Sequence, residues 1–152
     1  MPSEGFKRML VAVDGSDDGA RAAKVAVALA KKFGAELIVC HVIPTPTYSS
    51  VQAGTFGAGN MLYEYFESAR KEAKGIVDQV VKLAEADGVE ATSVIRDNVF
   101  SAVEGIVKLA EDRSVDLIVI GTRGLSGFRK LLMGSVSLGV INHAHCSVLL
   151  VR

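Results

Sequence analysis

Two spacings of apolar residues alternate along this chain. Short runs rich in valine and isoleucine are separated by longer stretches in which apolar and polar positions recur with the period of a helix. This alternation is typical of βαβ units, in which helices cover both faces of a parallel sheet. The apolar runs predict strands at residues 8–14, 36–43, 91–96, 116–121 and 147–151. The stretches between them predict helices at about residues 17–33, 60–87, 100–113 and 134–143.

The connections between these elements predict the order of the strands. Right-handed crossovers carry the chain from the first strand to the second and third on one side, and to the fourth and fifth on the other. The predicted fold is a single doubly wound, five-stranded parallel α/β sheet in the order 3-2-1-4-5, with helices on both faces. Such sheets bind ligands beyond the carboxyl ends of their strands, where the strand order reverses. Here the reversal falls between the first strand and the fourth.

Local signals set the limits of the first helix. Ser16 is a suitable N-cap, and Gly34 is suited to the C-terminal end of the helix. Asp17 and Asp18 lie in the first turn, where the helix dipole favours carboxylates. The helix is also rich in alanine, which allows a close approach to the sheet.

The stretch at about residues 44–59 interrupts the alternation. It contains Pro44 and Pro46 and three glycines, spaced G-x-x-G-x-G. That spacing differs from the dinucleotide-binding fingerprint, and no predicted strand directly precedes the first of these glycines. We interpret the stretch as a flexible connection or lid in preference to a phosphate site.

Composition narrows the possible partners. The 152 residues fit one domain, residues 1–152, and contain 17 Lys and Arg against 17 Asp and Glu. Without a strong net field, neither nucleic acid nor an anionic membrane is an expected partner. No apolar stretch approaches the roughly 18 residues of a membrane span, so we expect a soluble, cytoplasmic protein. Cys40 and Cys146 stand in separate apolar runs without metal-ligand spacing, which predicts buried thiols.

A glycine-containing loop follows the predicted fourth strand. Two glycines come first, and nine residues later a third glycine and two serines open the last predicted helix. The segments are Gly121, Thr122, Arg123 and Gly124, followed by Gly134, Ser135, Val136 and Ser137. Glycines let the backbone approach an anion, the amides of a helix start favour negative charge, and serine hydroxyls can donate further hydrogen bonds. The pattern predicts a polyphosphate site and therefore a nucleotide.

A second polar signal lies at the end of the predicted first strand, beside the point of reversal. Ala12, Val13 and Asp14 converge there with the glycine loop. Asp14 could accept hydrogen bonds from ribose hydroxyls, and alternatively its carboxylate forms a turn that caps the first helix. At the end of the second strand, the backbone of His41 and Val42 could contact a base. The imidazole of His41 is interpreted as a packed side chain.

At these residues the chain resembles the universal stress protein family. The spacing Gly121-x2-Gly124-x9-Gly134-Ser135-x-Ser137 is the nucleotide-binding pattern of the family's ATP-binding branch, and it is complete here. The resemblance covers nearly the whole chain, from the end of the first predicted strand to the last apolar run.

The resemblance implies a ligand and the groups that hold it. The ligand would be an adenine nucleotide, ATP or else ADP or AMP. Asp14 would hold the ribose and the Val42 backbone the adenine, while the glycines and serines of the loop would surround ribose and phosphates. Arg123 matches a position where the family often has Arg, and it would neutralise phosphate. Family dimers commonly join through the last strand, which implies a homodimer.

The chain departs from the family pattern after the third predicted strand. Many members have a Gly-x-Pro turn there, whereas this chain has Asp97, Asn98 and Val99. We expect that turn to lie away from the nucleotide site, so that the departure affects local geometry only.

Few residues indicate catalysis. Hydrolysis needs a positioned base and a held metal, and the Walker pattern G-x-x-x-x-G-K-[ST] is absent. Asp17 and Asp18 are interpreted as partners of the helix dipole. His143 and His145 lack the third ligand that a metal site requires. We predict no catalytic and no metal-binding residues, with Mg²⁺ at most carried on the phosphates.

The last strand predicts pairing between two copies of the chain. The run from Ser147 to Val151 forms an edge of the predicted sheet, and apolar edges are normally paired, covered or charged. Protection by Arg152 alone is the alternative. The leading hypothesis is an ATP-binding, homodimeric stress-response protein that acts as a nucleotide-dependent switch or interaction module for an unidentified client. A slow ATPase or nucleotidyl-transfer enzyme, and a nucleotide-free dimerisation scaffold, are the alternatives.

Overall fold

A parallel sheet of five strands organises the computed structural model, which describes residues 5–45, 59–122 and 134–152. The strands are β1 (Arg8–Ala12), β2 (Glu36–Pro44), β3 (Ala91–Val99), β4 (Leu117–Gly121) and β5 (Ser147–Val151). Their order is β3-β2-β1-β4-β5, and every pairing is parallel. The predicted fold class and strand order are confirmed.

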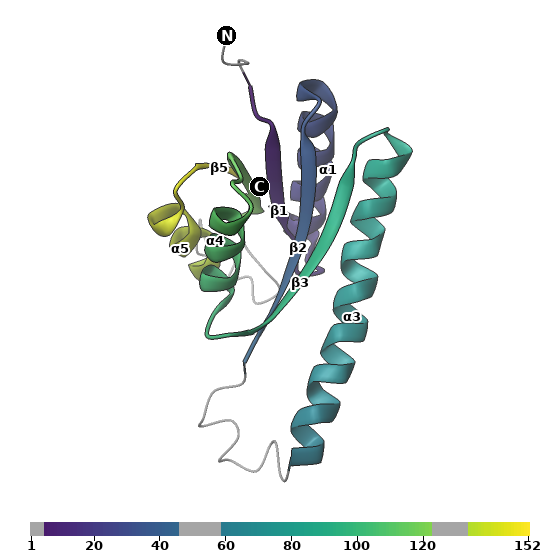
Figure 1. Ribbon diagram of the computed structural model, residues 1–152, viewed down its shortest axis with the longest axis vertical. Coiled ribbons are helices and arrows are strands. Elements are labelled where there is room, and N and C mark those ends of the chain that lie inside the picture. The colour runs from purple at the N-terminus through teal and green to yellow at the C-terminus, as the bar shows by residue number, and fades with distance from the viewer. Residues whose placement is uncertain (1–4, 46–58, 123–133) are drawn as a thin grey trace.

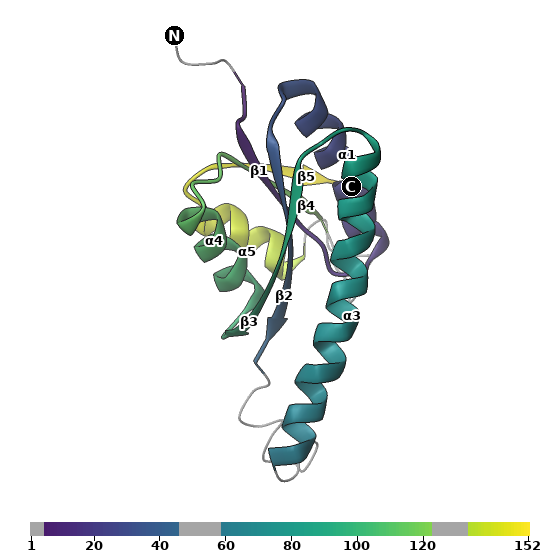
Figure 2. The same ribbon diagram turned by 45° about the vertical axis from the view of Figure 1, so that its right-hand side comes forward.

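Helices cover both faces of the sheet. They are α1 (Asp17–Phe33), α3 (Gly59–Ala86), α4 (Ala102–Asp112) and α5 (Ser135–His143). Figure 1 shows α1 and α3 on one side of the strands and α4 and α5 on the other, and Figure 2 shows the same division after a turn of the molecule. The two faces therefore have separate helical partners.

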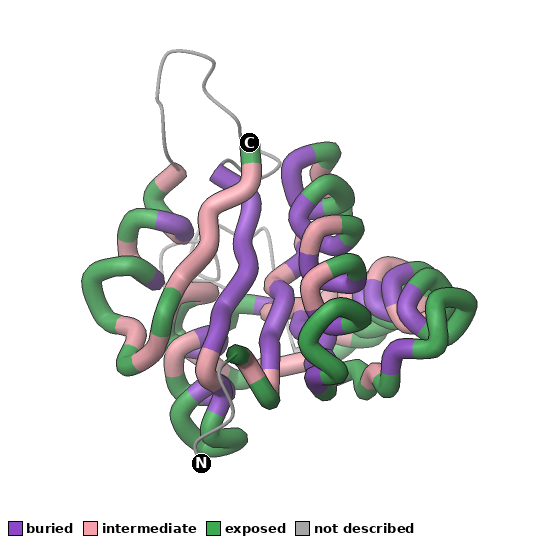
Figure 3. Tube along the Cα trace, turned by 90° about the horizontal axis from the view of Figure 1, so that it is seen from above, coloured by how far each residue is buried: buried purple, intermediate pink, exposed green. Residues whose placement is uncertain are grey.

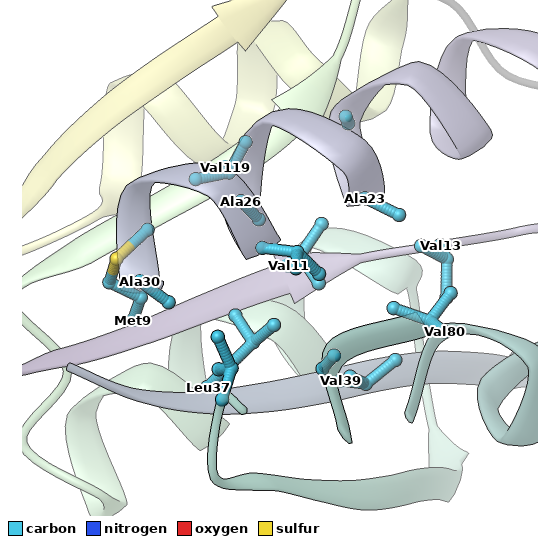
Figure 4. Close-up of a cluster of buried hydrophobic side chains, with 14 of the residues drawn as sticks. Met9, Val11, Val13, Ala23, Ala26, Ala30, Leu37, Val39, Val80 and Val119 are labelled. Atoms are coloured by element: carbon cyan, nitrogen blue, oxygen red, sulfur yellow. The ribbon is translucent and has the colours of Figure 1, made fainter. Parts of the chain in front are cut away.

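The side chains of each strand alternate between the two faces. Met9 and Val11 of β1 pack in the cluster beneath α1 and α3, whereas Leu10 packs in the cluster beneath α4 and α5. Figure 4 shows Ala26 and Ala30 of α1 lying against β1, where their small side chains allow the helix to approach closely. The same hydrophobic cluster also contains Val27 of α1, Leu37 and Val39 of β2 and Val77 of α3.

The edge of the sheet is less buried than its centre. β4 is buried along its whole length, whereas the last four residues of β5 are of intermediate exposure. Figure 3 shows this contrast between the strand that ends at the C-terminus and its neighbour. Only β4 pairs with β5 in the described sheet, so β5 forms one of its edges.

The limits of α1 agree with the prediction. The hydroxyl oxygen of Ser16 accepts a hydrogen bond from the Gly19 amide at 3.1 Å, which satisfies one of the unpaired amides at the helix start. Gly34 ends the helix with a φ of 66°, a conformation that glycine adopts without steric cost.

Other boundaries differ from the prediction. β1 ends at Ala12 and not at Asp14, because the chain turns into α1 through Gly15, whose φ is +87°. One rung of pairing continues past the strand, since the Val13 amide donates to the Cys40 carbonyl at 2.9 Å.

The third strand is longer than predicted, and the helix after it is shorter. β3 runs on to Val99 because the register shifts between Val42 and Pro44, and Val99 then pairs with Pro44. The Thr45 amide also donates to the Val99 carbonyl at 2.9 Å. α4 consequently begins at Ala102, not at residue 100, after Ser101 as its N-cap.

The two cysteines occupy different environments. Cys40 is fully buried, as predicted, and burial raises the pKa of its thiol to about 12. Cys146 is only partly buried, so the prediction is wrong for this residue. It precedes the edge strand β5, where no further strand of the described sheet covers it.

The interrupted stretch of the sequence falls mainly on residues 46–58, outside the described residues. At its two ends, Pro44 closes β2 and Gly59 opens α3. Within the described ranges, no helix is both long enough and apolar enough to cross a membrane.

Candidate functional site

A cavity of about 310 Å³ opens at the carboxyl ends of β1, β2 and β4. It lies on the face that carries α4 and α5, at the predicted reversal of strand order. Its lining comes from six parts of the fold and comprises Ala12, Val13, Asp14, Ser16, Gly19, Cys40, Val42, Ala102, Ile106, Ile120, Gly121, Thr122, Gly134, Ser135, Val136 and Ser137.

The floor of the cavity is formed by three residues in register. Ala12 pairs with Cys40 of β2 on one side and with Ile120 of β4 on the other. Paired positions in a sheet point to the same face, so these side chains lie side by side beneath the cavity. The central one is an alanine, whose methyl group leaves volume that a larger residue would fill.

Asp14 lies between the floor and the start of α1. Its Oδ1 accepts a hydrogen bond from the Ser16 amide at 2.9 Å, which is the turn predicted as one interpretation of this residue. A Cβ on Gly19 would meet that oxygen at 3.1 Å, so the carboxylate rests against the first turn of the helix. Asp14 also lines the cavity. The turn and a contact with a ligand are therefore compatible.

The start of α5 forms the opposite wall. Gly134 is the N-cap and has no side chain to accept hydrogen bonds from the first amides of the helix. Those amides belong to Ser135, Val136 and Ser137, all of which line the cavity. Amides at a helix start favour negative charge, so this wall is suited to an anion.

Two donors that the sequence suggested for an anion have partners within the protein. The Gly134 amide donates to the Thr122 carbonyl at 2.5 Å. The Ser137 hydroxyl is buried and lies 3.0 Å from both the Thr122 and Gly134 carbonyl oxygens, to which it donates. These contacts fix the geometry of the helix start.

Gly121 is required by packing at the end of β4. A Cβ at this position would lie 2.9 Å from the backbone carbon and oxygen of Asp18. The strand can therefore pass the first turn of α1 only with a glycine here. Next to it, the Thr122 hydroxyl donates to the buried Asp18 carboxylate at 3.2 Å.

Asp18 and Asp17 differ in their surroundings. Asp18 is 7% exposed, and its carboxylate forms an ion pair with Arg21 in addition to the bond from Thr122. Asp17 is exposed. Both lie in the first turn of α1, as predicted, but Asp18 also connects that helix to β4.

The two predicted residues of β2 point to opposite faces. Val42 lines the cavity. His41 is outside its lining, and its Nδ1 lies 2.7 Å from the Val13 carbonyl, in hydrogen-bond contact. The interpretation of the imidazole as a packed side chain agrees with this contact.

Helix α4 also lines the cavity, a contribution that was not predicted from the sequence. Ala102 and Ile106, one helical turn apart, line the cavity. A Cβ on Gly105 would meet Val42 at 2.9 Å, so this glycine lets α4 approach β2. Residues 97–99, where the chain departs from the family pattern, form the end of β3 and are absent from the lining of the cavity. The i, i+4 spacing of Ala102 and Ile106 was the only signal for their shared face.

Some predicted positions are not tested by the geometry. Arg123 and Gly124 lie outside the described residues. In the part of the chain that is described, no three His, Cys, Asp or Glu side chains gather as a metal site would require. The His143 Nδ1 is in contact with the Gly139 carbonyl at 2.8 Å.

Comparison with known sequences gives a consistent result. The model of the universal stress protein family matches residues 5–152. The universal stress protein YxiE of Bacillus subtilis is 36% identical, over 97% of this chain and 99% of that protein. The universal stress protein MJ0531 of Methanocaldococcus jannaschii is 35% identical, over 97% of this chain and 82% of that protein.

Solved structures of similar fold include three that are informative here. UspA from Lactobacillus plantarum has a TM-score of 0.85 at 23% identity, over 99% of this chain and 100% of that one. A universal stress protein solved in complex with cAMP has a TM-score of 0.62 at 27% identity, over 98% of both chains. One from Archaeoglobus fulgidus, in complex with dAMP, has a TM-score of 0.68 at 23% identity, over 97% of this chain and 98% of that one.

Proposed function

The chain belongs to the universal stress protein family, and we propose that it binds an adenine nucleotide, ATP in the first instance, in the cavity above Ala12. The observation that carries this proposal is the pairing of Asp14 with the start of α5 across one cavity of about 310 Å³. A carboxylate suits ribose hydroxyls and a helix start suits phosphate, so the two walls match the two polar parts of a nucleotide. The volume is at the lower end of the roughly 300–1,000 Å³ that small-molecule pockets occupy.

The remaining wall suits a base. Val42, Ala102 and Ile106 present apolar surface beside the floor of the cavity. An aromatic base can be held between such side chains while the backbone at the end of β2 contacts its edge. Arg123 would add a positive charge near the phosphates, and Mg²⁺ would come with the phosphates.

One family member of similar structure supports this assignment, since its structure holds cAMP, and a second, solved with dAMP, has a similar fold. Both ligands contain adenine, a sugar and a single phosphate. The second member is less than one quarter identical to this chain, so its contribution is limited to the fold. The choice of ATP rests on the complete glycine and serine pattern of the loop.

We further propose that the protein is a single nucleotide-binding domain that acts in the cytoplasm as a homodimer. The dimer would form through β5, whose apolar residues are half-buried at the edge of the described sheet. Unpaired strand edges attract other strands, and a second copy offers the same edge. In this proposal the dimer is a nucleotide-dependent switch: the bound nucleotide determines whether the dimer binds a client protein.

The test compares two alanines of similar exposure in different strands. Ala12→Leu fills the floor of the cavity and is expected to abolish ATP binding in isothermal titration calorimetry. Ala91→Leu makes the same change in β3, away from the cavity, and is expected to retain the affinity of the wild type. Unchanged affinity in the Ala12 variant, with circular dichroism showing a folded protein, would place the nucleotide elsewhere. Phosphate release measured in the same samples would detect hydrolysis.

A further inference from the structure

Thr122 connects three elements around the cavity. It is 4% exposed and follows directly on β4. Its carbonyl accepts hydrogen bonds from the Gly134 amide and the Ser137 hydroxyl, both at the start of α5. Its amide donates to the Val151 carbonyl of β5 at 3.0 Å, and its hydroxyl donates to Asp18 of α1 at 3.2 Å.

The contact with α1 fixes the side chain of Thr122. Asp18 is 7% exposed, and a buried carboxylate that loses a hydrogen-bond donor is costly because water cannot replace it. The preceding residue, Gly121, lies against the Asp18 backbone without room for a Cβ. These two contacts link Thr122 and Gly121 to the first turn of α1.

The contact with α5 joins Thr122 to the anion-binding wall. A phosphate at the helix start would restrain Gly134 and Ser137, the residues that donate to the Thr122 carbonyl. Restraining those donors restrains the acceptor. Because the same residue donates its amide to Val151, the effect extends to the last rung between β4 and β5.

β5 is the strand on which such an effect would be measurable. It pairs with β4 alone in the described sheet, and its last four residues are only half-buried. Elements with few buried contacts open at lower free energy than the rest of a protein. A firmer hydrogen bond from the Thr122 amide to the Val151 carbonyl would therefore slow the local opening of β5 more than that of the buried central strands.

We propose that Thr122 is a positioning residue that couples occupation of the cavity to the pairing of β5 with β4. This inference rests on the proposed nucleotide binding and adds to it a route by which the nucleotide reaches the edge strand. Coupling of this kind is reciprocal, so firmer pairing of β5 also raises nucleotide affinity.

The experiment measures amide hydrogen exchange by NMR, with and without saturating ATP, at Thr122 and along β5. In the wild type, ATP is expected to slow exchange at these amides by about fivefold or more, the lower end of typical coupling factors. Thr122→Val keeps the branched shape and the backbone hydrogen bonds but removes the hydroxyl that donates to Asp18. Its β5 exchange is expected to be faster without ATP and to change little on adding it.

Two further variants separate coupling from stability. Thr122→Ser keeps a hydroxyl and is expected to restore the response to ATP. Ser101→Ala removes the cap of α4, a hydrogen bond from the Glu104 amide at 3.1 Å, and leaves the partners of Thr122 named above unchanged. It is expected to lower the melting temperature and to keep the wild-type response of β5. If Thr122→Val does not fold, Ser137→Ala tests the same route from α5 by removing a donor to the Thr122 carbonyl.

The outcomes separate this inference from the function on which it rests. A wild type that binds no ATP in calorimetry overturns the proposed function and the coupling together. A wild type that binds ATP without slowing exchange in β5 overturns the coupling alone. So does an unchanged response in Thr122→Val, or an equal loss of response in Ser101→Ala.

Discussion

The two faces of β1 are packed to different degrees although they belong to the same five residues. On one face, Val11 lies under the alanine-rich side of α1 and is fully buried. On the other, Leu10 is fully buried under α4 and α5, but Ala12 lies two residues further on at the floor of a cavity. The cavity thus comes from one small side chain at the carboxyl end of a strand that is otherwise filled on both sides. The contrast shows how a sheet can be stable and still keep a site open.

The largest predicted effect on stability comes from replacing an alanine by leucine on each of the two faces of the sheet. Ala26→Leu places a larger side chain where α1 meets the sheet, at a residue that is 0% exposed, and overpacking of this kind costs about 1–3 kcal/mol. Ala12→Leu is expected to cost less than about 1 kcal/mol because the cavity has room for the added atoms. Urea unfolding of both variants measures the difference.

Equal losses of stability in these two variants would contradict the comparison. They would mean that the surroundings of Ala12 close over the cavity, or that α1 can move away from the sheet. A stable Ala12→Leu variant is also what the ATP-binding test requires, since loss of binding is informative only in a folded protein.

A smaller effect is predicted for the ATP affinity when either of two carboxylates near the start of α1 is neutralised. Asp14→Asn is expected to weaken ATP binding about tenfold, or about 1.4 kcal/mol, because a neutral amide is a weaker partner for ribose hydroxyls than a carboxylate. Asp17→Asn makes the same change at an exposed position outside the lining of the cavity and is expected to leave the affinity unchanged. Calorimetry at constant salt measures both.

Asp14 also accepts the hydrogen bond of the turn before α1, so the melting temperature of its variant has to be measured alongside. Asparagine retains an acceptor for the Ser16 amide, which limits that contribution. Equal affinities for the two variants would remove Asp14 from the nucleotide site and leave it only the turn.

The sequence predicted the framework because the relevant signals are local. The apolar runs located the strands, the crossover rule gave their order, and Ser16 and Gly34 set the limits of α1. The longer β3 could not be predicted in this way, because it depends on a register shift opposite Pro44 that only the paired strands reveal.

The site was predictable only in part, for a related reason. The glycine and serine pattern identified the segment at the start of α5, but not that the Gly134 amide and the Ser137 hydroxyl would be taken by Thr122. That depends on how the chain returns to the end of β4. The part played by Ala102 depends likewise on the packing of α4 against β2, which Gly105 permits. Side chains brought together by tertiary packing leave little trace in the spacing of a single segment.

The smallest predicted effect is a pH dependence of the free energy of unfolding. It arises from Cys40, which lies at the floor of the cavity, between the close-packed core and the open site. Cys40 lines the cavity yet is 0% exposed, and burial raises the pKa of its thiol from 9.0 to about 12. In the unfolded chain the thiol loses its proton near pH 9, whereas in the folded protein it keeps it. The stabilising contribution is therefore complete below pH 9 and is lost as the pH rises towards 12. Between about pH 8 and 9.5, this thiol alone should lower the free energy of unfolding by about 1 kcal/mol.

Cys40→Ala isolates that contribution. The variant is expected to be less stable at neutral pH, because it loses buried volume, but its unfolding free energy should fall less steeply above pH 8 than that of the wild type. Urea unfolding at a series of pH values gives the two slopes, and their difference removes the contribution of the other titrating groups. Identical slopes would mean that water reaches the thiol through the cavity, so that the floor is part of the open region. A smaller slope in the variant would mean that the Cys40 thiol belongs to the close-packed core. The space open to water would then begin only at the methyl group of Ala12.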